Sequence, residues 1–200
     1  DIIKGDVRST EDFERLPKAD AFISLQGNPG IPWSLAWPKY DFNVNALGTL
    51  NVLEYARTHG NIPVIYASTN KVYSDNINEI PLREKETRYE WDFNNKDLEW
   101  FNDKAMGPNG ITEELTTEGY GKYPHSPYGV SKLTGDHYCQ EYYLTFGLPT
   151  VINRMSCIYG LYQKGVADQG WIDHFVRQSF TDKPQLDIYG DGKQVRDMLW

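Results

Sequence analysis

One continuous stretch carries a helix pattern and then a strand pattern: KYDFNVNALGTLNVLEYARTHGNIPVIYAST, residues 39–69. Apolar side chains recur at helical spacing over Lys39–His59, and Gly60 follows as a residue that commonly ends helices. The next run, Asn61–Ala67, is almost wholly apolar, which is typical of a strand in a buried parallel sheet. A helix that leads directly into such a strand predicts part of a strand–helix–strand unit.

The same alternation extends to both sides of this stretch. Strands are predicted over Asp20–Leu25 and Leu148–Arg154. The other predicted elements are a strand end over Asp1–Val7, a capped helix over Ser9–Leu16, helices over Ser126–Phe146 and Trp171–Phe180, and a strand over Gln185–Tyr189. Strands that alternate with helices predict the α/β class, with a Rossmann-like, doubly wound parallel sheet.

Composition limits the class of protein. The 200 residues are 40% hydrophobic and 14% aromatic, which is enough to bury a core, and they are most simply one domain. The formal charge of −8 and the pI near 5.0 argue against nucleic acid or an anionic membrane as a partner. No apolar run is long enough to span a bilayer, and the first residues lack the order of a signal peptide. We therefore expect a soluble, cytoplasmic protein.

Cysteine and histidine spacing argues against a metal site. Cys139 and Cys157 form no Cys-x-x-Cys pair and are expected to be packed thiols. The four histidines lack the close spacing of a helical or hairpin metal site; they are His59, His125, His137 and His174. We expect no bound metal.

Tyr128 and Lys132 are the first candidates for chemistry. Ser126 and Pro127 favour a helix start with the serine as N-cap, which puts Tyr128 and Lys132 at i and i+4 on one face. A positive charge close to a phenol lowers its pKa, so Tyr128 would be able to act as a base near neutral pH. The alternative is an ordinary helix surface, with the ring packed and the amine solvated.

A hydroxyl group at the end of the predicted central strand supplies the context. Ser68, Thr69 and Asn70 follow the Asn61–Ala67 run, at the edge where open α/β sheets bind ligands. A hydroxyl there can hydrogen-bond a substrate alcohol and orient it toward Tyr128. Together these residues predict a hydride-transfer site.

Four separated blocks of sequence resemble one known family. They are Ser68–Tyr73, Ser126–Gly129, Asp168–Trp171 and Gly190–Asp197. In this order they are similar to the extended short-chain dehydrogenase/reductases, specifically the NAD-dependent nucleotide-sugar epimerases, and closest to the branch that acts on CDP-sugars. The resemblance covers nearly the whole chain. It implies NAD as cofactor, a nucleotide-diphosphate sugar as substrate, and a homodimer or homotetramer if a helix leaves an apolar face exposed.

The resemblance also assigns roles to residues. Tyr128 is implied to be the catalytic base, Lys132 to hold the nicotinamide ribose and lower the tyrosine pKa, and Thr69 to assist. Further residues implied on the cofactor side are Asp6, Val7, Leu25, Gln26, Gly27 and Asn45. Those implied on the substrate side are Thr69, Asn70, Gln169, Trp171 and Arg196, the arginine being suited to grip a diphosphate.

Two features depart from the family. No Gly-x-Gly-x-x-Gly or Gly-x-x-Gly-x-x-Gly loop opens a strand–helix unit, although a Rossmann fold seats the dinucleotide pyrophosphate on such a loop. We therefore expect an internal fragment, inactive alone, that lacks the first strand–helix–strand unit and most of a substrate domain beginning near residue 160. The stretch Ser74–His125 is also long. It is expected to be a surface excursion with its own aromatic cluster or, alternatively, a lid.

Several functions compete. The leading one is transient oxidation of a sugar hydroxyl to a ketone, followed by return of the hydride to the other face, with no net consumption of NAD. A dehydratase of the family needs an Asp-Glu pair after the threonine, where this chain has Asn70-Lys71. A reductase would use the same triad for one-way transfer. A non-catalytic nucleotide-sensing scaffold would have no need of a tuned phenol.

Overall fold

A computed structural model describes residues 2–28, 30–73, 77–78, 80–92, 106–107, 110–111, 124–167 and 169–200. The chain divides into two compact units, Asp1–Val72 with His125–Met155 and Tyr73–Pro124 with Ser156–Trp200. Much of the predicted excursion over Ser74–His125 lies outside the described residues, as does Asp168. Each unit is described by itself below.

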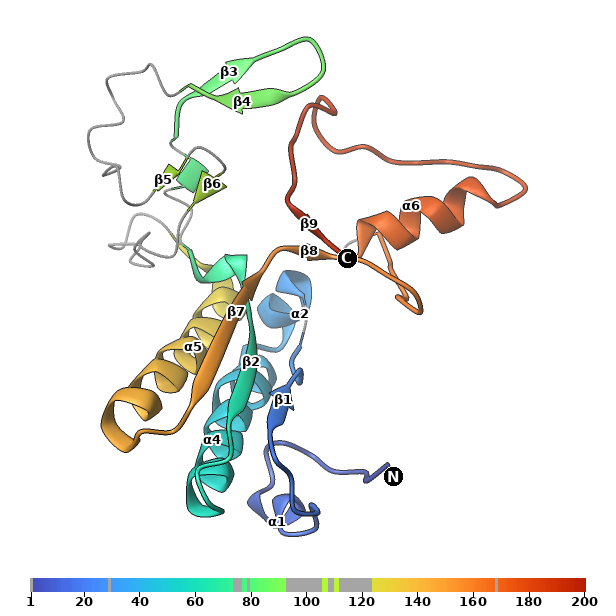
Figure 1. Ribbon diagram of the computed structural model, residues 1–200. Coiled ribbons are helices and arrows are strands. Elements are labelled where there is room, and N and C mark those ends of the chain that lie inside the picture. Colours follow the sequence, from blue (N-terminus) through green and yellow to red (C-terminus); the bar gives the residue numbers. More distant parts are fainter. Residues whose placement is uncertain are drawn as a thin grey trace. The chain divides into compact units, whose positions relative to one another are not determined.

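A three-stranded parallel sheet forms the centre of the first unit (Figure 1). Its strands are β1 (Phe22–Ser24), β2 (Val64–Thr69) and β7 (Thr150–Met155), in the order β1-β2-β7. Val64 of β2 lies opposite both Phe22 and Thr150. All three strands correspond to predicted ones. Because they run in the same direction, Thr69 lies at the carboxyl edge of the central strand.

Two long helices cover one face of this sheet. In Figure 1, α4 (Gly48–Thr58) and α5 (Ser126–Phe146) run behind the strands, and α5 contacts both β2 and β7. The shorter segments are α1 (Thr10–Phe13), α2 (Ile31–Ala36), α3 (Pro38–Phe42) and the single 3-10 turn η2 (Asn70–Val72). Within the described residues, no helix combines the length and the hydropathy needed to cross a bilayer.

The predicted helix over Lys39–His59 contains a wider turn than expected. Between α3 and α4 lies a π-helical turn, η1 (Asn43–Leu47). The Thr49 hydroxyl donates a 2.6 Å hydrogen bond to the Asn45 carbonyl and so gives that group a partner. Apolar periodicity does not separate a π turn from an α turn, so the sequence does not reveal it.

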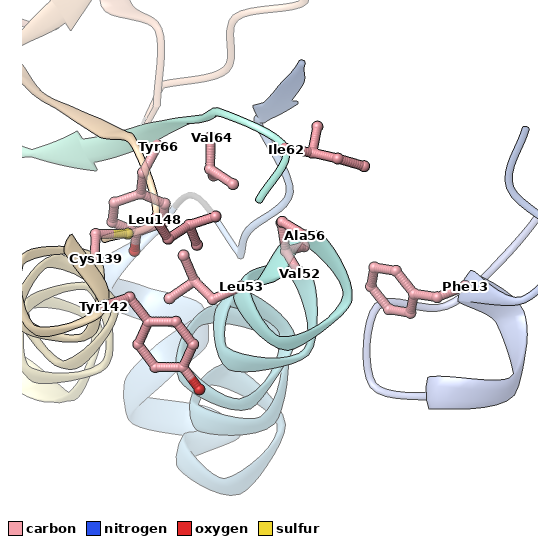
Figure 2. Close-up of a cluster of buried hydrophobic side chains, with 10 residues drawn as sticks. All are labelled: Phe13, Val52, Leu53, Ala56, Ile62, Val64, Tyr66, Cys139, Tyr142 and Leu148. Atoms are coloured by element: carbon pink, nitrogen blue, oxygen red, sulfur yellow. The ribbon is translucent and has the colours of Figure 1, made fainter. Parts of the chain in front are cut away.

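The core of the first unit packs between the sheet and the two long helices (Figure 2). Leu53 of α4, Tyr66 of β2 and Cys139 of α5 are fully buried. Burial of a side chain such as Leu53 contributes about 1.5–3 kcal/mol. The other residues in Figure 2 are Phe13, Val52, Ala56, Ile62, Val64, Tyr142 and Leu148. Cys139 is therefore a packed thiol, and burial raises its pKa to about 12, whereas Cys157 is partly exposed.

The opposite face of the sheet is exposed in the described residues. Side chains alternate along a strand, and Tyr66 and Ser68 point toward the helices. Ile23 of β1 and Val151 of β7 are 65% and 54% exposed. Helices of the described chain therefore cover one face, whereas a doubly wound sheet carries helices on both.

The second unit consists of short strand pairs and one helix. Its elements are the antiparallel pair β3 (Leu82–Glu84) and β4 (Tyr89–Trp91), the antiparallel pair β5 (Met106–Gly107) and β6 (Gly110–Ile111), the parallel pair β8 (Cys157–Ile158) and β9 (Met198–Leu199), and α6 (Trp171–Ser179). Buried Ile80 is the centre of a small cluster with Tyr73, Ile77, Trp91 and Ile111. Trp91 is the only member of this cluster that belongs to the aromatic residues predicted to cluster in the excursion; the others, Phe93, Trp100, Phe101, Tyr120 and Tyr123, lie outside the described residues, so the aromatic cluster stays a prediction.

Two predicted strands are wrong. Residues 2–7 and 185–189 pair with no strand in the described part of the chain. A run of apolar residues forms a strand only where a neighbour completes its hydrogen bonds. Ile2 and Tyr189 are 96% and 78% exposed, so neither side chain is buried in the described core.

Candidate active site

Tyr128 and Lys132 lie on the first turns of α5. The helix begins at Ser126, which has a φ of 65°, and Pro127 occupies the first turn. The Ser126 hydroxyl accepts a 3.2 Å hydrogen bond from the Gly129 N–H. The predicted capping bond is therefore present, although the helix includes Ser126 itself.

The first turn of α5 closely approaches the end of β2. A Cβ on Gly129 would lie 2.5 Å from the Lys71 carbonyl oxygen, so this approach requires glycine. Thr69 is buried, and its Oγ1 lies 3.2 Å from the Lys71 N–H nitrogen and 3.4 Å from Asn70 Oδ1. The Thr69 side chain also lies near enough to the Tyr128 side chain to act on the pKa of that phenol. The structure thus brings together the two hydroxyl groups predicted to act on a substrate alcohol.

The pKa of Tyr128 shifts in the direction opposite to the prediction. Burial raises the pKa above its usual value of 10.0, the nearby Thr69 side chain acts to lower it, and the charge of Asp41 adds to the rise. The predicted lowering by Lys132 is therefore wrong for this structure. The Lys132 ammonium, 4.4 Å from the centre of the Tyr66 ring, is not among the groups that shift the pKa of Tyr128.

Lys132 is a buried ammonium group. The residue is 4% exposed, and burial lowers its pKa from 10.5 to about 8. The face of the Tyr66 ring provides a cation–π contact, while the Tyr66 hydroxyl donates a 3.2 Å hydrogen bond to the Lys132 carbonyl. Within the described residues, no hydrogen bond or ion pair engages the Lys132 Nζ. A buried donor of this kind is suited to a polar group of a ligand.

Predicted cofactor residues converge on the loop after β1. A Cβ on Gly27 would lie 3.1 Å from Asn45 Oδ1 and 3.8 Å from Lys132 Nζ. Gln26 Nε2 lies 3.4 Å from Thr49 Oγ1, and Leu25 is 71% exposed. The structure therefore places the side chains of Asn45 and Lys132 next to the backbone of Gly27, which has no side chain of its own.

Asp6 and Val7 lie near the amino-terminal end of the described chain. The Asp6 carboxylate accepts hydrogen bonds from Arg8, whose side chain lowers the pKa of Asp6 to about 2. The Val7 carbonyl accepts a 2.8 Å hydrogen bond from Asn51 Nδ2 of α4. The bond from Asn51 joins the segment to α4, and contact of Asp6 with an adenine stays a prediction.

Two buried carboxylates near the site were not predicted. Asp136 accepts hydrogen bonds from Ser68 Oγ at 2.8 Å and from Arg154 Nε and Nη2 at 2.9 Å. Burial acts to raise the pKa of Asp136, but the hydrogen bonds from Arg154 and Ser68 outweigh it and the pKa is lowered. Asp41 is also fully buried. No sequence signal marks either residue, because aspartate is usually found at the surface.

Three predicted substrate residues belong to the second unit. Gln169 lies in a turn and is exposed, as is Arg196. Trp171 begins α6 and packs its ring against Phe175, with 5.5 Å between ring centres. Because Tyr128 lies in the first unit, the role of these three residues at the site stays a prediction.

The β3–β4 hairpin holds the loop that precedes Arg196. The Tyr89 hydroxyl donates a hydrogen bond to Asp191, and the Tyr89 N–H donates one of 3.0 Å to the Lys193 carbonyl. Lys193 Nζ lies 2.6 Å from Glu84 Oε1. The block that resembles the substrate side of the family thus rests on the excursion.

Comparison with known proteins decides the family. The NAD dependent epimerase/dehydratase family matches residues 1–95 and 99–200. The chain belongs to this family. It is 37% identical over 207 residues to the CDP-paratose 2-epimerase of Salmonella typhi, and the match covers all of this chain and 56% of that protein. The chain therefore spans about half the length of the curated relatives it matches.

Solved structures agree with membership of the epimerase/dehydratase family. Pal from Bacillus thuringiensis matches with a TM-score of 0.70 and 25% identity, over 98% of this chain and 52% of Pal. A double mutant of DesIV, a dTDP-glucose 4,6-dehydratase from Streptomyces venezuelae with NAD bound, matches with a TM-score of 0.65 and 25% identity, over 98% of this chain and 49% of DesIV. The predictions of a Rossmann-like parallel sheet, of the family and of its cofactor NAD are confirmed.

The chemistry of the first unit fits a dinucleotide. NAD carries ribose hydroxyls, which an ammonium group such as Lys132 Nζ can hydrogen-bond, and Gly27 leaves space beside that nitrogen. Within the described part of the chain, no cluster of His, Cys, Asp and Glu is arranged to hold a metal ion.

Proposed function

We propose that the complete protein is an NAD-dependent nucleotide-sugar epimerase that converts CDP-paratose to CDP-tyvelose by inverting C2. The observation that carries this proposal is the close approach of the first turn of α5, which holds Tyr128, to the end of β2, which holds Thr69, with Lys132 one turn further along α5. The 37% identity to the CDP-paratose 2-epimerase of Salmonella typhi supports the choice of substrate. The residues of the four sequence blocks that resemble the family favour the same class of enzyme.

In this proposal, Thr69 and Tyr128 act on one hydroxyl of the sugar. The Thr69 hydroxyl orients the alcohol oxygen, and Tyr128 Oη takes its proton as the carbon is oxidised to a ketone. Bound NAD supplies the acceptor for the hydride and gives the hydride back. Tyr128 then returns the proton to the same oxygen, so the reaction inverts one carbon without net oxidation.

Lys132 has two roles in this scheme. Its Nζ, beside Gly27, would hold a ribose hydroxyl of NAD. Because burial raises the pKa of Tyr128, the phenolate depends on positive charge that comes close when the site is filled. The Lys132 pKa of about 8 leaves most of these ammonium groups charged at pH 7.

The residues after Thr69 favour an epimerase over a dehydratase. Elimination of water requires an acid that protonates the leaving hydroxyl and a base that removes a proton from carbon. Asn70 and Lys71 occupy the two positions that resemble the Asp-Glu pair of the dehydratases. An amide and an ammonium group do not supply that acid and base.

In the direct test, the complete protein is incubated with NAD and CDP-paratose in deuterated water, and the products are followed by NMR. We expect CDP-tyvelose without solvent deuterium at C2, since the same hydrogen returns to the carbon. Tyr128→Phe should lower kcat by about 100-fold or more, the range of general acid–base effects. Tyr143→Phe is the matched control, because Tyr143 is a 57% exposed tyrosine of the same helix.

Other outcomes identify the competing functions. Net conversion of NAD to NADH with stable oxidised product, or the reverse with NADH, would indicate a one-way dehydrogenase or reductase. Loss of water from the sugar would indicate a dehydratase. A folded protein that binds neither NAD nor a CDP-sugar would contradict the proposal and favour a scaffold.

A further inference from the structure

A fully buried carboxylate on α3 accepts hydrogen bonds from three separate segments of the first unit. Asp41 Oδ1 lies 2.7 Å from Asn28 Nδ2, in the loop after β1, and 3.1 Å from Asn45 Nδ2, in the π turn. Asp41 Oδ2 lies 2.6 Å from Ser131 Oγ on α5. A buried carboxylate is costly unless such donors surround it, so this carboxylate specifies where the three donors lie.

The donors are also bonded to one another. Asn45 Nδ2 lies 2.9 Å from Ser131 Oγ, and Asn45 Oδ1 accepts a 2.8 Å hydrogen bond from the Asn28 backbone N–H. The NH2 group of Asn45 therefore faces Asp41, and its oxygen faces the loop after β1 at Asn28. The orientation of this amide is decided by Asp41, because only the NH2 group can donate to a carboxylate.

This network borders the candidate site on two sides. Ser131 directly precedes Lys132 and lies within the turn that begins at Tyr128. Asn28 directly follows Gly27, on which a Cβ would lie 3.1 Å from Asn45 Oδ1 and 3.8 Å from Lys132 Nζ. A shift of the Asp41 carboxylate would therefore move the loop at Gly27, or the turn that carries Lys132, relative to the other.

We propose that Asp41 is a positioning residue of the NAD site, which fixes the Gly27–Asn28 backbone against the first turn of α5 through Asn45 and Ser131. This inference rests on the proposed use of NAD. Asp41 does not touch the reacting atoms in this account, since its own oxygens are taken up by Asn28, Asn45 and Ser131. Its charge reaches the site as well, because it acts to raise the pKa of both Tyr128 and Lys132.

The conservative variant Asp41→Asn separates hydrogen bonding from charge. Its amide oxygen can accept from Asn28 and Asn45, while its NH2 group faces Ser131. The Ser131 hydroxyl can accept that bond and turn its proton to the Tyr128 carbonyl, which already lies 2.9 Å away. Asp41→Ala removes all three acceptor contacts; Asn45 and Ser131 keep their bonds to Ser131 and to the Tyr128 carbonyl, whereas the Asn28 side chain loses its acceptor.

The experiment measures the dissociation constant of NAD by calorimetry, together with the thermal midpoint, for the complete protein and its variants. Asp41→Ala should weaken NAD binding by about tenfold or more, the size expected when hydrogen bonds to a buried charge are lost. Asp41→Asn should restore most of that loss. Ser34→Ala, which removes another fully buried hydroxyl of the first unit, should leave the NAD affinity unchanged.

A second variant keeps the test decisive if Asp41→Ala does not fold. Asn28→Ala removes one donor from a half-buried loop and should weaken NAD binding by about threefold or more with little change in the thermal midpoint. Wild-type NAD affinity in Asp41→Ala, or in Asn28→Ala where Asp41→Ala does not fold, would overturn the inference. A wild-type protein that binds NAD but does not epimerise would overturn only the proposed function, and one that binds no NAD would overturn both.

Discussion

At the residue scale, Lys132 combines a positive charge with almost complete burial. The folded state lowers its pKa to about 8, whereas the unfolded chain has the ordinary value of 10.5. Between these two values the unfolded state binds more protons than the folded state. The contribution of Lys132 to the free energy of unfolding therefore rises as the pH increases through this window and is least favourable below pH 8.

Lys132→Met should remove this cost. At pH 7 the variant is expected to raise the free energy of unfolding by about 1–3 kcal/mol, since a buried charge gives way to an apolar chain of similar length. The gain should shrink between pH 8 and 10.5. Chemical denaturation at pH 7 and pH 10 measures the difference, and a variant less stable than wild type at pH 7 would show that the ammonium is better solvated than its burial indicates.

Residue spacing predicts part of the candidate site and misses the rest for a physical reason. Thr69 and Tyr128 were placed together because a strand end and a helix start meet at one edge of a parallel sheet. Asp41 and Asp136 were missed because burial of a carboxylate depends on donors far away in sequence, such as Ser131 and Arg154. The sign of the Tyr128 pKa shift was missed for the same reason, since burial is a tertiary property.

At the element scale, the close approach of α5 to η2 depends on Gly129. Helix propensity alone predicts that Gly129→Ala stabilises the protein by about 0.5–1 kcal/mol. The new Cβ would instead lie 2.5 Å from the Lys71 carbonyl oxygen and 3.0 Å from the His125 Cβ. We expect a loss of about 1–3 kcal/mol, as is usual for overpacking.

Urea unfolding of Gly129→Ala distinguishes the two effects by the sign of the change. His137→Ala, at an exposed position of the same helix, serves as the control and should change stability by about 0.5 kcal/mol or less. A more stable Gly129→Ala variant would mean that the α5 turn moves away from η2 at little cost. In that case Tyr128 would also be expected to move away from Thr69.

Elements with strong local signals were predicted with the correct bounds. α5 has a proline in its first turn and ends at Gly147, which has a φ of 67°, so both ends follow from local chemistry. The strand predicted over residues 185–189 also contains apolar residues, but no strand of the described chain pairs with it. Strand formation depends on a partner segment, which local sequence does not specify.

At the scale of the whole molecule, two helical segments expose apolar side chains. Val130 and Leu144 of α5 are 50% and 74% exposed, and Tyr40 of α3 is 51% exposed. Exposed apolar residues that recur along one helix face are typical of a surface that another protein chain covers. This is the feature from which a homodimer or homotetramer was predicted.

We expect the complete protein to be a homodimer in solution, with the outer face of α5 in the interface. Introducing charge at two points of that face, Val130→Glu with Leu144→Glu, should give a monomer, because an interface core does not accept unpaired charges. Phe180→Glu, at an 86% exposed position outside α5, should leave the mass unchanged. Sedimentation equilibrium measures the mass, and a monomeric wild-type protein would contradict this prediction.

The two cysteines of the chain differ in their access to reagents. Cys139 is fully buried with a pKa of about 12, so almost none of it is thiolate at neutral pH, whereas Cys157 is partly exposed. A maleimide dye should therefore label this chain at Cys157 and leave the core intact. Because Cys157 lies on β8, which pairs with the strand that follows Arg196, the fluorescence of such a dye would test whether a nucleotide sugar binds near Arg196, as predicted.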